Sequence, residues 1–386
     1  MVDTEGNAIY LASERAPGWS KASLRKYALP PLGSLTLYHG GPDRTGVMPG
    51  PGPTGKPVIT WDVARGGAIP FSIMPVVASG RVIVADASGT LAALDEGTGR
   101  QLWTAGLEST SRSSPALIDG LVIAATDAGT VVASNSTDGA RAWQKTIGGG
   151  AITASLLIAD GALFVGDEDG RLFRIDPHTG KQAWSLDVGG AVTRGPAFAG
   201  GVIYVGSTGG QFSAINAATH RELWRAQLGP GEVGTPAVGD GRVYVGRGLH
   251  ANAPPHDLVA LDIRDGSFLW SFASPAGRQV HMGGLANSLV YAVSDDGNVY
   301  ALDAATGAQR WTAHTGGSLG TLAGLVGNIA YVSSADQTIR AFNALTGEQQ
   351  WSITVRGTPT MPAVIDGRVF GSSRSADRRS CLANQS

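Results

Sequence analysis

The residues best placed to do chemistry lie in one insertion and beside it. The insertion, 246–257, reads G-R-G-L-H-A-N-A-P-P-H-D and carries His250 and His256. Together with Glu232 and His281 they offer imidazole and carboxylate groups, which are ligands for zinc and similar metals, and His281 could act as a general acid or base. A His-x5-His spacing in a proline-rich loop has no fixed geometry. We therefore predict no metal site and interpret the insertion as part of a binding surface.

A sequence repeat supplies the strands and turns that carry these residues. The eleven-residue phrase A-L-D-A-A-T-G-A-Q-R-W at 301–311 occurs in seven versions, each with Asp or Asn eight residues before a terminal Trp. The Trp residues are Trp103, Trp143, Trp184, Trp224, Trp270, Trp311 and Trp351, mostly 40 or 41 apart, and Trp61 keeps the same register. We expect each Trp to pack on the neighbouring repeat and pair its N–H there. A period near 40 with four short strands per unit is typical of β-propeller blades.

The repeat predicts the number of blades and how the ring closes. Seven complete units run roughly 68–106, 107–147, 148–188, 189–228, 229–273, 274–314 and 315–355. An eighth begins at 360–372, and the strand around Trp61, 57–63, could complete it. Pairing the chain ends would remove an exposed sheet edge. The sequence therefore predicts an all-β, eight-bladed propeller of four-stranded antiparallel blades, with the last blade closed by an N-terminal strand.

The segments outside the complete units have weaker patterns. Residues 1–34 read as an N-terminal extension or a diverged hairpin, and 35–386 as the propeller. Within the latter, 35–57 is rich in Gly and Pro and reads as an ordered surface loop or leader. Residues 374–386 make a poor strand, so we expect the last blade to be incomplete there.

Alternating strand directions place the connections between blades and the turns between second and third strands on one face, around the mouth of the central channel. Most residues entering the innermost strands are Gly, Ser, Thr or Ala. Exceptions are Arg112, Arg194, Glu232, Arg278, His281 and Met361. Because loops on a rigid scaffold carry function, the predicted partner-binding residues are Arg112, Arg194, Glu232, Arg278, His281, His250 and His256. No catalytic residue is predicted.

Composition narrows the possible functions. The 386 residues carry a net charge of −2 and no basic run, which disfavours nucleic acid and anionic membranes as partners. Cys381 is the single cysteine, so disulfide frameworks and cysteine-rich metal sites are excluded. The sequence lacks a signal peptide pattern, a membrane-spanning stretch and the familiar nucleotide-binding and hydrolase motifs. We expect a monomer.

The phrase A-x-[DN]-x-x-[TD]-G-x-x-x-W, best matched at 93–103, 260–270, 301–311 and 341–351, resembles the tryptophan-docking motif of PQQ-type, or quinoprotein alcohol dehydrogenase-like, eight-bladed propellers. It departs from that motif at Arg174 and His220. The leader Y-H-G-G-P-D-R-T-G at 38–46 is similar to that of bacterial propellers of this group. The resemblance covers about 35–372 and implies a propeller fold. The group contains quinone-dependent dehydrogenases, ligand-sensing propellers and non-catalytic scaffolds such as BamB.

Catalytic members of the group typically bring an adjacent cysteine pair and a calcium ion held by Glu, Asn and Asp, to which no residue here can be matched. The first hypothesis is therefore a non-catalytic, BamB-like scaffold that binds protein or peptide partners at the mouth and needs no cofactor. The alternative is a PQQ-dependent alcohol or polymer-alcohol dehydrogenase, with Arg112 or Arg194 facing the quinone carboxylates and Glu232 on calcium. A second alternative is a small-ligand sensor domain. The resemblance implies an extracytoplasmic location.

Overall fold

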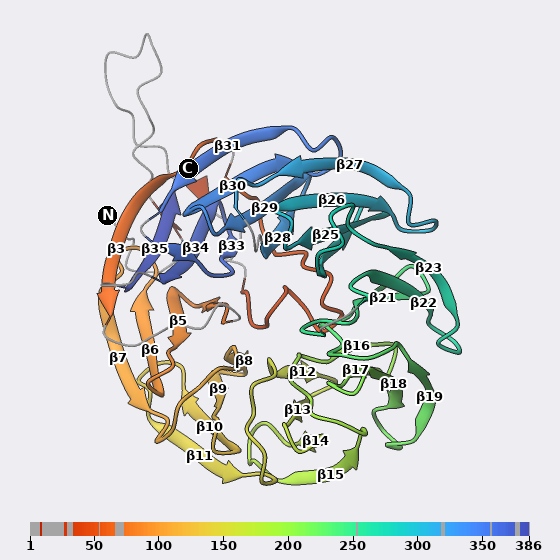
Figure 1. Ribbon diagram of the computed structural model, residues 1–386. Helices are drawn as coiled ribbons and strands as arrows, with labels where there is room; N and C mark the ends of the chain where they lie inside the picture. Colours follow the sequence, from red (N-terminus) through yellow and green to blue (C-terminus); the bar gives the residue numbers. More distant parts are fainter. Residues whose placement is uncertain are drawn as a thin grey trace.

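The fold is a ring of antiparallel sheets (Figure 1). The computed structural model describes residues 8–9, 27–28, 34–53, 55–65, 73–251, 254–317, 321–355, 357–374 and 379–385. All the regular elements in these ranges are strands. None of the described residues belongs to a helix long and apolar enough to cross a membrane.

Seven sheets are four-stranded blades whose strands follow chain order from the centre outward. Blades 1 to 3 consist of β4 (Val76–Ala78), β5 (Arg81–Ala85), β6 (Thr90–Asp95) and β7 (Gln101–Gly106); β8 (Ala116–Ile118), β9 (Leu121–Ala125), β10 (Thr130–Asn135) and β11 (Arg141–Thr146); and β12 (Leu157–Ala159), β13 (Ala162–Gly166), β14 (Arg171–Ile175) and β15 (Gln182–Asp187). Blades 4 and 5 consist of β16 (Ala197–Ala199), β17 (Val202–Gly206), β18 (Gln211–Asn216) and β19 (Glu222–Gln227); and β20 (Ala237–Gly239), β21 (Arg242–Gly246), β22 (Leu258–Asp262) and β23 (Phe268–Phe272). Blades 6 and 7 consist of β24 (Val280–Ala286), β25 (Leu289–Ser294), β26 (Asn298–Asp303) and β27 (Gln309–His314); and β28 (Thr321–Val326), β29 (Ile329–Ser334), β30 (Thr338–Asn343) and β31 (Gln349–Thr354).

The prediction of eight four-stranded blades is wrong, because the structure has seven. The chain ends instead form a five-stranded closing sheet made of β3 (Val58–Arg65), β35 (Arg379–Gln385), β34 (Arg368–Arg374), β32 (Thr358–Pro359) and β33 (Ala363–Ile365). Its order is β3-β35-β34-β32, and β33 also pairs with β34. Pro359 and Pro362 interrupt the inner segment, because proline has no N–H to donate to a ladder. The closing sheet therefore does not repeat the blade pattern.

Of the first 34 residues, only 8, 9, 27, 28 and 34 are described. β1 (Ala8–Ile9) pairs antiparallel with β2 (Tyr27–Ala28). The rest of the predicted extension or hairpin, apart from residue 34, lies outside the described residues.

The turn between the two outer strands explains why the repeated phrase folds. In blade 6 the Asp303 carboxylate accepts hydrogen bonds from the backbone N–H groups of Ala305 at 3.1 Å and Thr306 at 2.9 Å. Gly307 ends the turn with φ of +73°, in the left-handed region that glycine adopts most easily. A Cβ there would lie 2.7 Å from the Trp270 ring. The glycine therefore lets the Trp of one blade lie flat against the turn of the next.

The tryptophans link neighbouring sheets through this contact. In six cases the indole N–H donates to the carbonyl just after the turn Asp or Asn, at 2.9–3.1 Å: Trp61 to Glu96, Trp103 to Ser136, Trp143 to Pro177, Trp224 to Ile263, Trp270 to Ala304 and Trp311 to Ala344. Trp184 is different. Its buried N–H has no partner among the described residues, and its ring lies tilted 5.9 Å from the ring of His220, which occupies the glycine position.

The leader, residues 34–53, fills the centre of the ring (Figure 1). It was expected to be a surface loop, and that part of the prediction is wrong. Leader carbonyls accept hydrogen bonds at 2.7–3.0 Å from the innermost-strand amides of Val77, Leu117, Phe198, Val238, Leu285 and Leu325. These amides would otherwise form unpaired sheet edges around an open channel. The leader thus completes the inner edges of six blades.

Arg44 connects the leader to the third blade and adds a contact to the fourth. Its side chain is fully buried. The guanidinium donates to the carbonyls of Leu156 at 2.6 Å, Pro196 at 3.1 Å, and Tyr38. Burial lowers the pKa of Arg44 to about 10, while Tyr38 and Asp43 oppose that change. The group therefore stays charged at neutral pH and is satisfied by the backbone.

Candidate functional site at the mouth face

The mouth face is defined here as the face formed by the connections between blades and by the turns between second and third strands. In blades 2 to 6, backbone hydrogen bonds tie the connection to the turn. Glu168 N donates to Ala151 O at 2.9 Å in blade 3, and Thr208 N donates to Ala191 O at 3.0 Å in blade 4. In blade 5, Glu232 pairs with Leu249 through two bonds of 3.0 Å. Side chains on this face are therefore held by a firm backbone.

A cavity of about 280 Å³ opens on this face across blades 2 to 5. Its lining contains five ionisable groups from the blades, five hydroxyl groups and one glycine: Arg112, Glu168, Arg194, Glu232, His250; Tyr38, Thr153, Ser155, Thr193, Thr235; Gly195. Four of the seven predicted partner-binding residues, Arg112, Arg194, Glu232 and His250, therefore converge here.

Glu232 is the centre of one half of the cavity. Arg194 donates hydrogen bonds to its carboxylate from Nε at 2.8 Å and Nη2 at 3.3 Å. The Thr193 hydroxyl donates to the same carboxylate, and His250 Nδ1 lies 2.6 Å from Oε2. Burial acts to raise the pKa of Glu232, but the charge and hydrogen bond of Arg194 and the hydrogen bonds of Thr193 and His250 outweigh burial and hold that pKa below its usual range. Glu232 is therefore an ionised anchor at neutral pH.

The insertion positions His250 by bonds at its base. Arg247 and Asp257, at the two ends of the loop, form a bidentate pair at 2.7 and 3.1 Å. Leu249 is bonded to Glu232, so the next residue, His250, is brought over the Glu232 carboxylate. The His250 side chain remains 66% exposed at the rim.

Arg112 and Glu168 form the other half. Arg112 Nε lies 3.1 and 3.0 Å from the two oxygens of Asp127, while its Nη2 is 3.7 Å from Glu168 Oε1. Thr153 donates its hydroxyl proton to Glu168 at 3.0 Å. Gly150 allows this arrangement, because a Cβ there would lie 2.6 Å from Asp169 N in the turn that carries Glu168. Gly150 therefore lets the turn pack closely against the connection between blades.

Tyr38 is the residue of the leader that lines the cavity. Burial raises the pKa of its phenol, and Arg194 and Arg44 partly oppose that change. The phenol therefore stays neutral under physiological conditions. Arg44 lies over the Tyr38 ring, 5.6 Å from its centroid, so the buried arginine also supports this part of the cavity.

The remaining predicted residues lie elsewhere. His256 Nδ1 pairs with Gly248 O at 2.8 Å, and His281 Nε2 lies 3.4 Å from Asp295 Oδ1 in blade 6. Arg278 is exposed in the turn before β24, and Met361 is buried in the core. Among the described residues no group of three His, Cys, Asp or Glu side chains could hold a metal ion. The histidines and carboxylates therefore do not converge as one ligand set.

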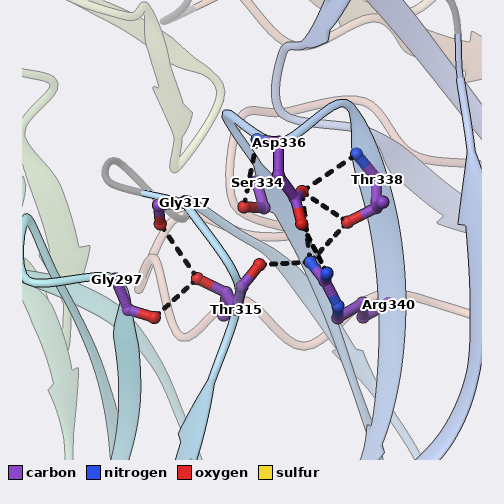
Figure 2. A network of polar contacts seen from close by, with 7 residues as sticks. All are labelled: Gly297, Thr315, Gly317, Ser334, Asp336, Thr338 and Arg340. Carbon is purple, nitrogen blue, oxygen red and sulfur yellow. Dashed lines mark hydrogen bonds and ion pairs between the residues drawn. The ribbon is translucent and has the colours of Figure 1, made fainter.

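The turn between the second and third strands of blade 7 carries a separate charged network on the mouth face (Figure 2). Arg340 pairs with both oxygens of Asp336 and donates to Thr315 O in the connection from blade 6. Thr338 donates its hydroxyl to Asp336 at 2.6 Å. Burial acts to raise the pKa of Asp336, but Arg340, Thr338 and Ser334 lower it to about 2. This cluster is closed on itself and supports the backbone.

Sequence reasoning missed Glu168 and the hydroxyl residues of the cavity. Glu168 sits in a turn of the common Asp-Glu-Asp-Gly kind, and Thr153, Ser155, Thr193 and Thr235 are small polar residues typical of every connection. Their position relative to one another in the repeat was the only available signal. Tyr38 belongs to the leader, whose central location no repeat pattern indicates.

These features define the class: a repeat propeller with a plugged centre and a polar cavity on its mouth face. The family model described as outer membrane protein assembly factor BamB matches residues 52–194, 168–284 and 255–376. The chain belongs to this family.

Solved structures agree on the fold. BamB from Moraxella catarrhalis is 21% identical with a TM-score of 0.65, covering 86% of this chain and 98% of that chain. The computationally designed Ika8 protein is 20% identical with a TM-score of 0.71, covering 83% and 97%. Quinohemoprotein alcohol dehydrogenase from Comamonas testosteroni is 15% identical with a TM-score of 0.72, covering 91% and 80%. No curated protein matches the chain. At these identities the structural likeness shows the fold alone.

Proposed function

We propose that the protein is a non-catalytic scaffold that binds a protein or peptide partner at its mouth face. The observation that carries this proposal is the cavity, where charged groups from blades 2 to 5 meet on a firm backbone. Three of them reach the rim: the Arg112, Glu168 and His250 side chains are 48%, 37% and 66% exposed. Polar groups at an exposed rim suit recognition of another surface.

The charged residues favour binding over quinone chemistry. Arg112 and Arg194, the groups expected to face a quinone's carboxylates, are already paired with Asp127 and Glu232. Glu232, the expected calcium ligand, has both oxygens engaged by Arg194 and its neighbours. A calcium-bound quinone would have to break these pairs, so the residues present do not fit it.

The family supports the location and the kind of partner. Its description names a factor in outer membrane protein assembly. We therefore propose that this chain takes part in outer membrane protein assembly outside the cytoplasm, with a protein as its partner.

A titration of the folded chain with PQQ and calcium tests the proposal against the dehydrogenase alternative. We expect no saturable heat, and no dye reduction when simple alcohols are added to the same sample. Far-ultraviolet circular dichroism before and after the titration controls for folding. Micromolar binding accompanied by alcohol-dependent dye reduction would contradict the scaffold proposal.

A further inference from the structure

The hydroxyl groups beside the two cavity carboxylates are oriented by the bonds they already make. Thr193 donates its proton to Glu232, and Thr153 donates its proton to Glu168. A hydroxyl has one proton and two lone pairs, so what remains for a ligand at these two positions is acceptor capacity. Both walls of the cavity therefore present lone pairs to anything that enters.

The two halves of the cavity differ in charge balance. In the Glu232 half, Arg194 matches the single carboxylate at 2.8 Å. In the other half, Arg112 faces two carboxylates and makes its close contact, 3.0 Å, with Asp127. Glu168 is left with the Thr153 hydroxyl and a guanidinium nitrogen at 3.7 Å. This half therefore carries one negative charge in excess, located on the exposed Glu168.

We infer that the cavity is a socket for a basic side chain, lysine or arginine, presented by the partner. Glu168 pairs with the charge, and the hydroxyl oxygens of Thr153 and Ser155 accept its remaining N–H groups. This inference rests on the proposed function, because it names the chemistry of the partner at the same site. A volume of about 280 Å³ lies just below the usual range of about 300–1,000 Å³ for small-molecule pockets, which suits one long side chain.

The cavity should bind an isolated basic side chain only weakly. An ion pair this exposed contributes little by itself, so we expect free lysine or arginine derivatives to bind with a Kd on the order of millimolar. The affinity should fall as salt is added, because both charges face water.

The test is a ligand-observed NMR titration of the full chain with Nα-acetyl-lysine amide and Nα-acetyl-arginine amide. Nα-acetyl-norleucine amide and Nα-acetyl-glutamate amide serve as neutral and anionic probes. We expect saturable binding of the basic probes, weakened about two- to fivefold by Glu168→Gln. Glu348→Gln, an exposed carboxylate on the opposite face, is the matched control and should bind like the unchanged chain.

A second variant separates the hydroxyl contribution from charge and from folding. Thr153→Val should weaken the basic probes and Thr153→Ser should restore them, with thermal unfolding confirming that each variant is folded. Equal binding to Glu168→Gln, preference for the anionic probe, or no saturation by either basic probe would overturn the socket. A protein partner captured at the mouth alongside any of these results would leave the scaffold proposal standing. If the basic probes bind but no protein partner is captured, the socket stands and the scaffold proposal fails.

Discussion

At the scale of residues, the buried charges of Arg44 and Glu232 are each held by several hydrogen bonds. Arg44 has no exposed surface and donates to three carbonyls, and Glu232 holds Arg194, Thr193 and His250. Such groups cost free energy to bury unless every hydrogen bond is made. The sequence shows that these residues are charged. It does not show that Arg44 lies at the centre of the ring, because that depends on the leader's path.

Asp336 gives the clearest pH dependence. Its folded pKa of about 2 lies below the unfolded value of about 3.9, so its contribution is present above pH 4 and is lost as the pH falls toward 2. The shift corresponds to about 2 kcal/mol. We predict that Asp336→Asn lowers the free energy of unfolding by about that amount at pH 7, and by less below pH 4.

Urea denaturation of both proteins at several pH values between 7 and 3 measures this. Asp160→Asn, an exposed carboxylate in the β12–β13 turn on the opposite face, should behave like the unchanged chain at every pH. A difference at Asp336 that stays constant across this range would show that the ion pair with Arg340 does not lower the pKa.

At the scale of elements, the repeat contains one natural exception. His220 holds φ of +51° where other units have glycine, and Trp184 lacks its hydrogen bond. We predict that His220→Gly stabilises the protein by about 1 kcal/mol, since glycine removes the backbone strain and lets the indole reach the Ala217 carbonyl. Thermal unfolding of the purified variant measures the change.

The reverse substitution is the control. Gly307→His in blade 6 adds a Cβ 2.7 Å from Trp270 at φ of +73°, so we expect it to destabilise by roughly 2 kcal/mol. If His220→Gly proves destabilising while Gly307→His is neutral, the glycine contact does not link the blades as described.

The elements show where sequence reasoning succeeds. Alternating apolar runs and Asx-Gly turns were enough to predict the four strands of each repeated unit. Residues 374–386 read as a poor strand, yet Arg379–Gln385 forms β35. Its place between β3 and β34 supplies ladder partners on both sides, and such pairing outweighs local preference.

At the scale of the whole molecule, the period of the repeat did not determine the blade count. Trp61 keeps the register, and this suggested an eighth blade, begun at 360–372 and completed by the strand around Trp61. The two chain ends meet in a five-stranded sheet instead, because pairing between distant segments is decided in space. The leader was missed for the same reason, since its hydrogen bonds run to segments up to 316 residues away in sequence.

The candidate site was predictable in part. Strand alternation correctly placed Arg112, Arg194, Glu232 and His250 on one face, and they meet in the cavity. Arg278 and His281 occupy equivalent positions in the repeat, but blade 6 is farther round the ring. Position along a repeat therefore identifies the face, whereas the ring decides which blades share a site.

The most direct measurement is photo-crosslinking in cells from a photoreactive amino acid placed at His250. The same residue at His178, which is exposed in the β14–β15 turn on the opposite face, is the matched control. We predict a discrete adduct with a protein of the outer membrane assembly machinery from position 250 and none from 178. No adduct at 250, or the same adduct at both positions, would contradict a partner-binding mouth face.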